Sequence, residues 1–242
     1  MADSLVIIPT FNEIENIGLI IHSVFALDQD FHILVVDDNS PDGTADVVKA
    51  LQEEYLDKLF IEVRRGKSGL GTAYIHGFKW AIEKKYEYIF EMDADFSHAP
   101  SDLIKLYQAC IDGADVAVGS RYKKGINVVN WPLHRILLSY GASFYVKLIT
   151  GMKVHDPTAG FVCYKRKVLE TINLDSIKFI GYAFQIEMKF RAYLQKYKIE
   201  EVPIIFTDRI RGKSKMSASI INEAVFGVIQ MKLRSLFHKK KF

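Results

Sequence analysis

Short apolar runs alternate with helical patterns along most of the chain. Runs of four or five mostly apolar residues between polar or turn-forming residues are typical of buried strands. Stretches in which apolar residues recur every three or four positions predict amphipathic helices. We expect strands at 5–8, 32–36, 59–63, 88–92, 115–118 and 202–206, and helices at 13–26, 44–55, 71–84 and 101–111. This alternation predicts an α/β fold with a mostly parallel central sheet and helices on both faces.

The alternation weakens after about residue 120. Residues 131–150 and 217–238 then have the pattern of helices with unusually apolar faces. We find no internal repeat, low-complexity tract or linker. We therefore expect one main domain over 1–216, with an amphipathic C-terminal helix and basic tail over 217–242 that packs on this domain or extends it.

The composition fits a folded protein of the reducing interior of a cell. Hydrophobic residues make up 49% of the 242 positions, which is enough for a sizeable core. Cys110 and Cys163 lie far apart and predict buried thiols. The N-terminus has no signal-peptide pattern, and no window reaches the ~18 apolar residues of a membrane span. We expect a cytoplasmic protein that is soluble or attached to a membrane surface.

Four polar clusters follow predicted strands: 9–13, 37–38, 64–67 and 93–95. Ligands of open α/β sheets bind beyond the carboxyl ends of the strands. Any one cluster alone is more simply a solvated loop. Four clusters at the same edge favour a ligand site.

The aspartates of these clusters suggest different roles. Alternate residues of an extended chain point the same way, so Asp93 and Asp95 can face one ligand. Hard carboxylate oxygens there suit Mg²⁺ or Mn²⁺, and the alternative is an acidic turn before Pro100. Asp37 and Asp38 point in opposite directions, so we expect one to meet the ligand and the other to tie down the loop. Asp42 with Thr44 is more typical of turn and helix-cap chemistry.

Several common functional motifs are absent or incomplete. Gly66-Lys67-Ser68 resembles the end of a phosphate-binding loop, but Ile61 stands where its first glycine belongs. Gly69-Leu70-Gly71 resembles a dinucleotide fingerprint, but Tyr74 replaces its last glycine. No HExxH, GxSxG or zinc-type spacing occurs. These observations argue against a nicotinamide dehydrogenase, and we expect no nucleic-acid partner.

The motifs PTFNE, VDDNSPDGT, KSGLGTAYIHGFKWA, MDADFSH, GSRY, DPTAGF and DRIRGKSK carry a resemblance in this order and spacing. Together they resemble a family 2 glycosyltransferase, and more narrowly the dolichyl-phosphate (polyprenyl-phosphate) mannose synthases. The similarity covers about residues 4 to 216. It implies a GT-A-type nucleotide-sugar-binding fold, of the single-domain kind without C-terminal transmembrane helices.

The resemblance also implies roles for individual residues. The guanosine site would include Pro9, Phe11, Glu13, Val36 and Asp38. Phe11 stands where the usual motif has Tyr, so stacking is kept and a hydroxyl contact is lost. Ser97 stands where some relatives have Gln, a better metal ligand. Asp93, Ala94 and Asp95 would face the diphosphate, and Asp95 and Ser97 would hold its metal. Arg121, Arg209 and Lys215 would contact the phosphates. Arg135 and Ser139 would hold the acceptor phosphate.

The implied reaction moves mannose from GDP-mannose to a polyprenyl (dolichyl-type) phosphate, with Mg²⁺ or Mn²⁺, in one inverting displacement. Asp95, Arg121, Arg135 and Ser139 would act at the reacting groups. A phosphate monoester has a second pKa of about 6, so this acceptor needs cationic positioning rather than a general base. One alternative is a UDP-sugar donor, such as UDP-glucose. Another is a non-catalytic nucleotide-sugar-binding scaffold, which would need none of Asp93, Asp95, Arg121 and Arg209.

The acceptor side has the character of a membrane surface. Arg135 and Ser139 are four residues apart on a predicted helix and share a face. Apolar residues flank them, and a second apolar helix ends in Lys239-Lys240-Lys241. This pattern predicts peripheral binding to the cytoplasmic face of a membrane, with a membrane-anchoring protein as a further candidate partner. The alternative is that these faces are ordinary core or a protein interface. The flanking residues are Trp131, Leu133, Ile136, Leu137, Tyr140, Phe144 and Tyr145, and those of the second helix are Ile221, Val225, Val228, Ile229, Leu236 and Phe237.

Overall fold

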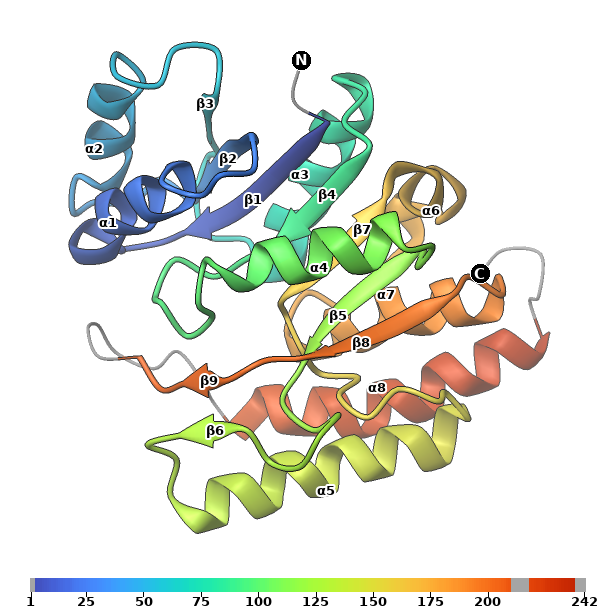
Figure 1. Ribbon diagram of the computed structural model, residues 1–242. Helices are drawn as coiled ribbons and strands as arrows, with labels where there is room; N and C mark the ends of the chain where they lie inside the picture. Colours follow the sequence, from blue (N-terminus) through green and yellow to red (C-terminus); the bar gives the residue numbers. More distant parts are fainter. Residues whose placement is uncertain (1–2, 210–217, 238–242) are drawn as a thin grey trace.

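The apolar runs of the sequence form one central sheet (Figure 1). The computed structural model describes residues 3–209 and 218–237, and in this part the sheet has seven strands in the order β3-β2-β1-β4-β7-β5-β8. Only β7 runs antiparallel to its neighbours β4 and β5, so the predicted mostly parallel sheet is confirmed. The strands are β1 (Ser4–Thr10), β2 (Phe31–Asp37), β3 (Leu59–Val63), β4 (Tyr88–Glu91), β5 (Val116–Ser120), β7 (Val162–Lys165) and β8 (Ile199–Pro203).

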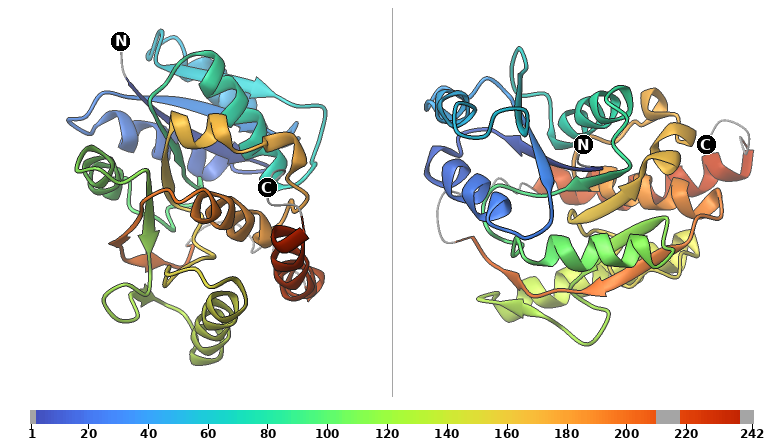
Figure 2. Two further views of the ribbon diagram at one scale, coloured as in Figure 1. Left: turned by 90° about the vertical axis from the view of Figure 1, so that its right-hand side faces the viewer. Right: turned by 45° about the horizontal axis from the view of Figure 1, so that its top comes forward.

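Helices cover both faces of the sheet, as the sequence predicts (Figure 2). Alternate residues of β1 show the division, because Val6 and Ile8 pack in one core and Leu5 and Ile7 in the other. Each such side chain, once fully buried, contributes roughly 1.5–3 kcal/mol. The first face carries α1 (Ile14–Phe25), α2 (Thr44–Leu51) and α4 (Asp102–Ile111), and the second carries α3 (Leu70–Glu83), α6 (Arg166–Thr171) and α7 (Tyr182–Leu194).

The glycines of the GLGTAYIHG motif let α3 lie close to its neighbours. A Cβ added at Gly77 would lie 2.7 Å from a methyl group of Ile7 on β1. One added at Gly71 would lie 2.8 Å from the ring of Phe184 on α7. These glycines therefore serve helix packing, which agrees with the rejection of a dinucleotide fingerprint.

The C-terminal part of the chain departs from the strand–helix alternation. Helix α8 (Ala218–Phe237) packs against α7 and against α5 (Leu133–Thr150), beyond the sheet (Figure 1). A two-stranded parallel ladder of β6 (Val128–Val129) and β9 (Phe206–Thr207) lies near the start of α5. The predicted strand at 202–206 is therefore wrong in extent, since β8 ends at Pro203 and β9 begins at Phe206. The sequence analysis also missed β6, β7, α6, α7 and a short 3-10 helix (Leu174–Ser176).

Candidate active site

The polar clusters predicted at strand ends meet at one edge of the sheet. Thr10 at the end of β1 pairs in register with Asp37 at the end of β2. The backbone N–H of Arg64, just after β3, donates to the carbonyl of Asp37. The N–H of Met92, just after β4, donates to the carbonyl of Ile7. Parallel strands thus bring residues from four distant segments into one site.

Asp37 and Asp38 differ in their contacts, and the predicted loop-holding role belongs to Asp37. Asp37 is fully buried and accepts hydrogen bonds from the hydroxyls of Thr10 (2.7 Å) and Ser40 (2.6 Å) and from the Ser40 N–H (2.8 Å). It therefore ties down the loop after β2. Asp38 instead accepts a hydrogen bond from Nε of Arg64 at 2.6 Å and forms an ion pair with that guanidinium.

Asp42 is a cap, as predicted. One carboxylate oxygen accepts the N–H of Ile14 at 3.1 Å, at the start of α1. The other accepts the N–H and the hydroxyl of Thr44, at the start of α2. These donors lie at the N-termini of α1 and α2, where backbone N–H groups lack partners within the helix. One carboxylate therefore caps both helices.

The residues proposed for guanosine differ in what they can offer. Pro9, Phe11 and Glu13 are partly exposed, and the ammonium of Lys67 lies 4.9 Å from the centre of the Phe11 ring. Glu13 accepts a hydrogen bond from the side chain of Asn16 at 3.1 Å. Val36 is fully buried in the core beneath α3, so its side chain is not available to a ligand and only its backbone is.

The segment of Asp93, Ala94 and Asp95 forms a turn rather than a continued strand. Strand β4 ends at Glu91, so the extended-chain argument for Asp93 and Asp95 facing the same way is wrong. Asp95 is nevertheless placed for a cation. Its carboxylate is 5% exposed, accepts the N–H of Ser97 at 3.0 Å and pairs with Arg209 at 2.8 Å.

This donor set fits a divalent cation that shares its ligands with a substrate. In the described residues, no group of three or more His, Cys, Asp and Glu side chains is placed to hold a metal by itself. Mg²⁺ typically takes one or two carboxylates and completes its shell with water and substrate phosphates. The Asp95 carboxylate already lies 2.8 Å from one cation, the guanidinium of Arg209, and it accepts the N–H of Ser97.

Arg121 is held by Asp156, a buried carboxylate that the sequence analysis did not assign. Asp156 accepts the Arg121 N–H at 3.0 Å, its Nε–H at 2.7 Å and an Nη2–H at 2.6 Å. Burial acts to raise the pKa of Asp156, but the charge and hydrogen bonds of Arg121 lower it below its ordinary value. The guanidinium is therefore fixed in one orientation beside the site.

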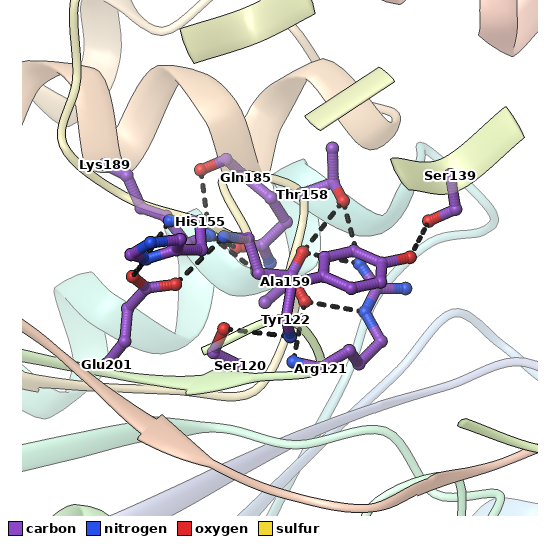
Figure 3. Close-up of polar contacts among 11 residues, drawn as sticks. Ser120, Arg121, Tyr122, Ser139, His155, Thr158, Ala159, Gln185, Lys189 and Glu201 are labelled. Carbon is purple, nitrogen blue, oxygen red and sulfur yellow. Dashed lines mark hydrogen bonds and ion pairs between the residues drawn. The ribbon is translucent and has the colours of Figure 1, made fainter. Parts of the chain in front are cut away.

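The loop that carries Asp156 is itself fastened by two buried charged side chains (Figure 3). Glu201 on β8 accepts the N–H groups of His155 (2.8 Å) and Asp156 (2.9 Å). Lys189 on α7 donates to the carbonyl of Ala159 at 2.5 Å. Burial lowers the pKa of Lys189 to about 8.

Arg135 and Ser139 lie on α5, and each has a partner from another element. Arg135 donates from Nη1 to Asp208 at 2.7 Å, and its guanidinium carbon lies 4.1 Å from the centre of the Trp131 ring. Ser139 accepts a hydrogen bond from the hydroxyl of Tyr122 at 2.7 Å (Figure 3). The motif DRIRGKSK thus reaches both sides of the site through Asp208 and Arg209, whereas Lys215 lies outside the described residues.

His98 is a further residue that the sequence analysis did not single out. It is buried directly after Ser97 and stacks on Phe161, with ring centres 4.8 Å apart and planes 10° apart. Burial lowers its pKa to about 4, so the imidazole is neutral at pH 7. The signal available in the sequence was its place at the end of MDADFSH.

Exposed apolar side chains cover α5 and α8. No helix in the described ranges is long and apolar enough to cross a membrane. The apolar face expected for the second helix is divided, because Val228 and Met231 are buried in a core with α7. Ile221 and Phe237 lie outside the described side chains. The exposed set is Leu133, Leu137, Leu138, Tyr140, Phe144 and Leu148 on α5, and Val225, Phe226, Ile229, Leu233 and Leu236 on α8.

Comparisons with known proteins agree with this geometry. The polyprenol monophosphomannose synthase of Mycolicibacterium smegmatis is 46% identical over 231 residues, covering 96% of this chain and 87% of that protein. The undecaprenyl-phosphate mannosyltransferase of Micrococcus luteus is 42% identical over 224 residues, covering 93% and 91%.

The fold also matches a solved structure. Glucosyl-3-phosphoglycerate synthase from Mycobacterium tuberculosis, in complex with Mn²⁺, UDP and glucosyl-3-phosphoglycerate, superposes with a TM-score of 0.65 at 17% identity, over 96% of this chain and 78% of that one. This likeness confirms the expected GT-A-type fold. The sequence profile described as glycosyl transferase family 2 matches residues 5–172, which is more than half of the chain. This protein therefore belongs to glycosyl transferase family 2.

Proposed function

We propose that this chain is a polyprenyl-phosphate mannosyltransferase that uses GDP-mannose as donor and a dolichyl-type monophosphate as acceptor. The observation that carries the proposal is the place of Arg135 and Ser139, on a helix lined with exposed apolar side chains. A cation beside a hydroxyl suits a phosphate, and apolar surroundings suit its lipid chain. The two relatives above, named for mannosyl transfer to polyprenol and undecaprenyl phosphates, support the same acceptor class.

The donor half is assigned to the strand-end clusters. Phe11 would stack on the base, with Pro9, Glu13, Asp38 and the backbone of Val36 around the nucleoside. Asp93, Ala94 and Asp95 would face the diphosphate. Asp95, with Ser97 beside it, would hold Mg²⁺ or Mn²⁺, which supplies charge neutralisation for the departing diphosphate. Arg121 and Arg209, together with Lys215 from the undescribed segment, would add cationic contacts to those phosphates.

The acceptor needs positioning rather than proton removal. A phosphate monoester with a second pKa of about 6 is largely dianionic at pH 7. One of its oxygens attacks the anomeric carbon of mannose, the bond from that carbon to GDP breaks, and GDP leaves with the electron pair. This single displacement inverts the anomeric centre. Arg135 and Ser139 would hold the attacking phosphate in line, and such orientation can supply several kcal/mol of the barrier reduction.

A transfer assay separates this function from its alternatives. The chain is incubated with Mn²⁺, polyprenyl phosphate and either labelled GDP-mannose or labelled UDP-glucose. We expect labelled lipid from GDP-mannose. Transfer from UDP-glucose alone would show the wrong donor, and no transfer from either would support a scaffold.

Arg135→Ala tests the division of the site. Loss of a charge-assisted hydrogen bond worth ~1.5–3 kcal/mol should lower kcat/KM for polyprenyl phosphate by about one to two orders of magnitude. GDP-mannose affinity should stay within about threefold, and Arg135→Lys should rescue only in part because ammonium lacks the planar fork. Arg166→Ala is a matched control, because Arg166 is equally exposed (29%) and is also ion-paired, but to Glu87. Lost donor binding with intact acceptor binding would contradict the assignment.

We also propose that α5 and α8 rest on the cytoplasmic face of a bilayer. The proposed acceptor is itself a lipid, and a basic tail follows the exposed apolar residues of α8. The buried cysteines Cys110 and Cys163, which form no disulfide, fit the reducing side of that membrane.

Vesicle sedimentation tests this placement. Leu137→Glu should weaken binding to vesicles that contain anionic lipid. Leu56→Glu, at a comparably exposed site after α2, should not. Binding of the parent to vesicles without any other protein would make an anchoring partner unnecessary. Equal binding of the parent and Leu137→Glu would refute docking through α5.

A further inference from the structure

The two residues assigned to the acceptor phosphate are each held by the chain neighbour of a donor-side arginine. Ser139 is bonded to Tyr122, which follows Arg121. Arg135 is bonded to Asp208, which precedes Arg209. Nothing in the sequence pattern requires this double arrangement. It means that neither acceptor residue is oriented by its own helix alone.

The Tyr122–Ser139 contact determines what the serine hydroxyl can do. Tyr122 is 5% exposed and donates its O–H to the Ser139 oxygen at 2.7 Å (Figure 3). An accepting hydroxyl keeps its own proton for another partner. Ser139 can therefore donate to a phosphate while Tyr122 fixes its oxygen. The Tyr122 ring also lies 5.3 Å from the guanidinium carbon of Arg121, so it contacts both halves of the site.

Asp208 makes the corresponding link on the other side. One oxygen of its carboxylate accepts from Arg135 at 2.7 Å, and the other accepts the backbone N–H of Arg209 at 3.1 Å. Among the described residues, Asp208 takes one hydrogen bond from Arg135, and a guanidinium has five N–H groups. Asp208 therefore orients Arg135 without exhausting its donors, and the Trp131 ring fixes the plane.

Backbone hydrogen bonds make these links stiff. Thr207 donates to the carbonyl of Ser97, beside the proposed metal ligand. Asp208 donates to the carbonyl of Val129, four residues before Leu133 begins α5. The segment of β9 is thus pinned between the aspartate turn and the start of α5. A movement of Arg209 relative to Asp95 can therefore shift Asp208 and, through it, the orientation of Arg135.

We propose that Tyr122 and Asp208 are positioning residues that couple donor binding to acceptor binding. This inference rests on the proposed function. A diphosphate bound near Asp95 would attract the Arg209 guanidinium toward its own oxygens. The backbone N–H of Arg209 donates to the Asp208 carboxylate, and the same carboxylate orients Arg135. A shift of Arg209 would therefore reach Arg135 through Asp208. The repulsion between two anionic substrates opposes their joint binding. The bound divalent cation offsets part of this repulsion by its charge, so a tightening that is lost when Tyr122 or Asp208 is changed acts through oriented protein groups.

The experiment measures binding, so that turnover is not needed. The dissociation constant of a short-chain isoprenyl phosphate is determined by calorimetry with and without saturating GDP and Mn²⁺, which carry no sugar to transfer. The ratio of the two constants is the coupling factor. The variants are Tyr122→Phe, which removes one hydroxyl, and Asp208→Asn, which removes one charge. The matched controls are Tyr197→Phe, which loses a hydroxyl bonded to Thr171, and Asp175→Asn, which loses a surface pair with Lys79.

We expect GDP with Mn²⁺ to tighten acceptor binding at least fivefold in the parent, at the lower end of usual coupling factors. The factor should fall below twofold in Tyr122→Phe and in Asp208→Asn and stay at the parent value in both controls. GDP affinity in the absence of acceptor should stay within about threefold in all four. If Tyr122→Phe does not fold, Asp208→Asn decides alone, because Asp208 is 32% exposed and its side chain is not part of a core.

The coupling proposal would be overturned by a coupling factor below twofold in the parent, or by an unchanged coupling factor in both variants. If Arg135→Ala still binds the acceptor more weakly in either case, the proposed function is unaffected. If Arg135→Ala binds the isoprenyl phosphate as tightly as the parent, the acceptor assignment itself is wrong, and the coupling proposal is overturned with it.

Discussion

Replacing Glu91 by glutamine should stabilise the protein near neutral pH and have almost no effect in acid. Glu91 ends β4 and is fully buried, and neither carboxylate oxygen has a hydrogen-bond partner among the described residues. Burial raises its pKa from 4.5 to about 8; the charge of Lys189 and the nearby amide of Gln185, which does not reach hydrogen-bond geometry, oppose the shift, and the charge of Asp93 adds to it. The side chain is therefore a neutral acid at pH 7, and glutamine is its neutral isostere.

The sign follows from proton counting. Between pH 4.5 and about 8 the folded chain keeps the Glu91 proton and the unfolded chain loses it, so stability falls as pH rises. One proton corresponds to a slope of ~1.4 kcal/mol per pH unit. From pH 5 to 7.5 the expected loss is on the order of 3 kcal/mol. Lys189, with a pKa of about 8, is charged in both states below this limit and adds no slope.

Urea unfolding of the parent and of Glu91→Gln at several pH values tests this expectation. The difference in unfolding free energy between the two proteins isolates the contribution of Glu91. This comparison is needed because His98, with a pKa of about 4, makes stability rise with pH between pH 4 and 6.5, which is the opposite sign. The advantage of the variant should grow steadily from pH 5 to 7.5. The rival view is a buried ion pair of Glu91 with Lys189. In that case the variant would be less stable by ~3–5 kcal/mol near neutral pH, because a buried ammonium would lose its charged partner.

Three further predictions concern the site and the tail. Asp95→Ala should abolish metal-dependent transfer and Mn²⁺ binding by calorimetry while the thermal midpoint stays close to the parent; near-normal turnover at saturating Mg²⁺ would refute the metal assignment. Asp156→Asn should lower the free energy of unfolding by ~3–5 kcal/mol in urea titrations, because it leaves the Arg121 guanidinium without its counter-charge. Removing 239–242 should weaken binding to anionic vesicles by roughly 1 kcal/mol per Lys at low salt. Salt-independent, unchanged binding would contradict this last expectation.

The first half of the fold was predictable because its strands are almost wholly apolar and its helices have one apolar face. Helix α7 was not, since three charged residues of its middle and end, Glu187, Lys189 and Arg191, are buried. Glu187 and Arg191 satisfy each other at 2.6 Å, and Lys189 finds the carbonyl of Ala159. In the sequence, these charged residues interrupt the helical repeat of apolar positions that would indicate a buried helix. The partners that allow their burial are known only from the folded structure.

The candidate site was predictable to the extent that strand ends define it. The clusters around Asp37 and Asp95 could be placed at one edge from topology alone. Asp156, Tyr122 and Asp208 could not, because their contacts span 35, 17 and 73 positions of the chain. GSRY, DPTAGF and DRIRGKSK marked these segments, but spacing alone does not say which acid meets which arginine.

The pairing of arginines with aspartates changes how the site is understood. The sequence analysis assigned Asp95 to a metal, Asp38 to the nucleoside, and Arg121, Arg135 and Arg209 to phosphates. It gave no role to Asp156, Asp208 or Arg64. Within the described part of the chain, each of four arginines of the site forms an ion pair with an aspartate: Arg64 with Asp38, Arg121 with Asp156, Arg135 with Asp208 and Arg209 with Asp95. Four unpaired guanidiniums in one site would repel each other and rotate. A carboxylate that takes some donors of each fork fixes the remaining donors in direction, and such preorganised donors stabilise developing charge without reorganising during the reaction. The aspartates of this chain therefore serve the arginines as much as they serve a ligand.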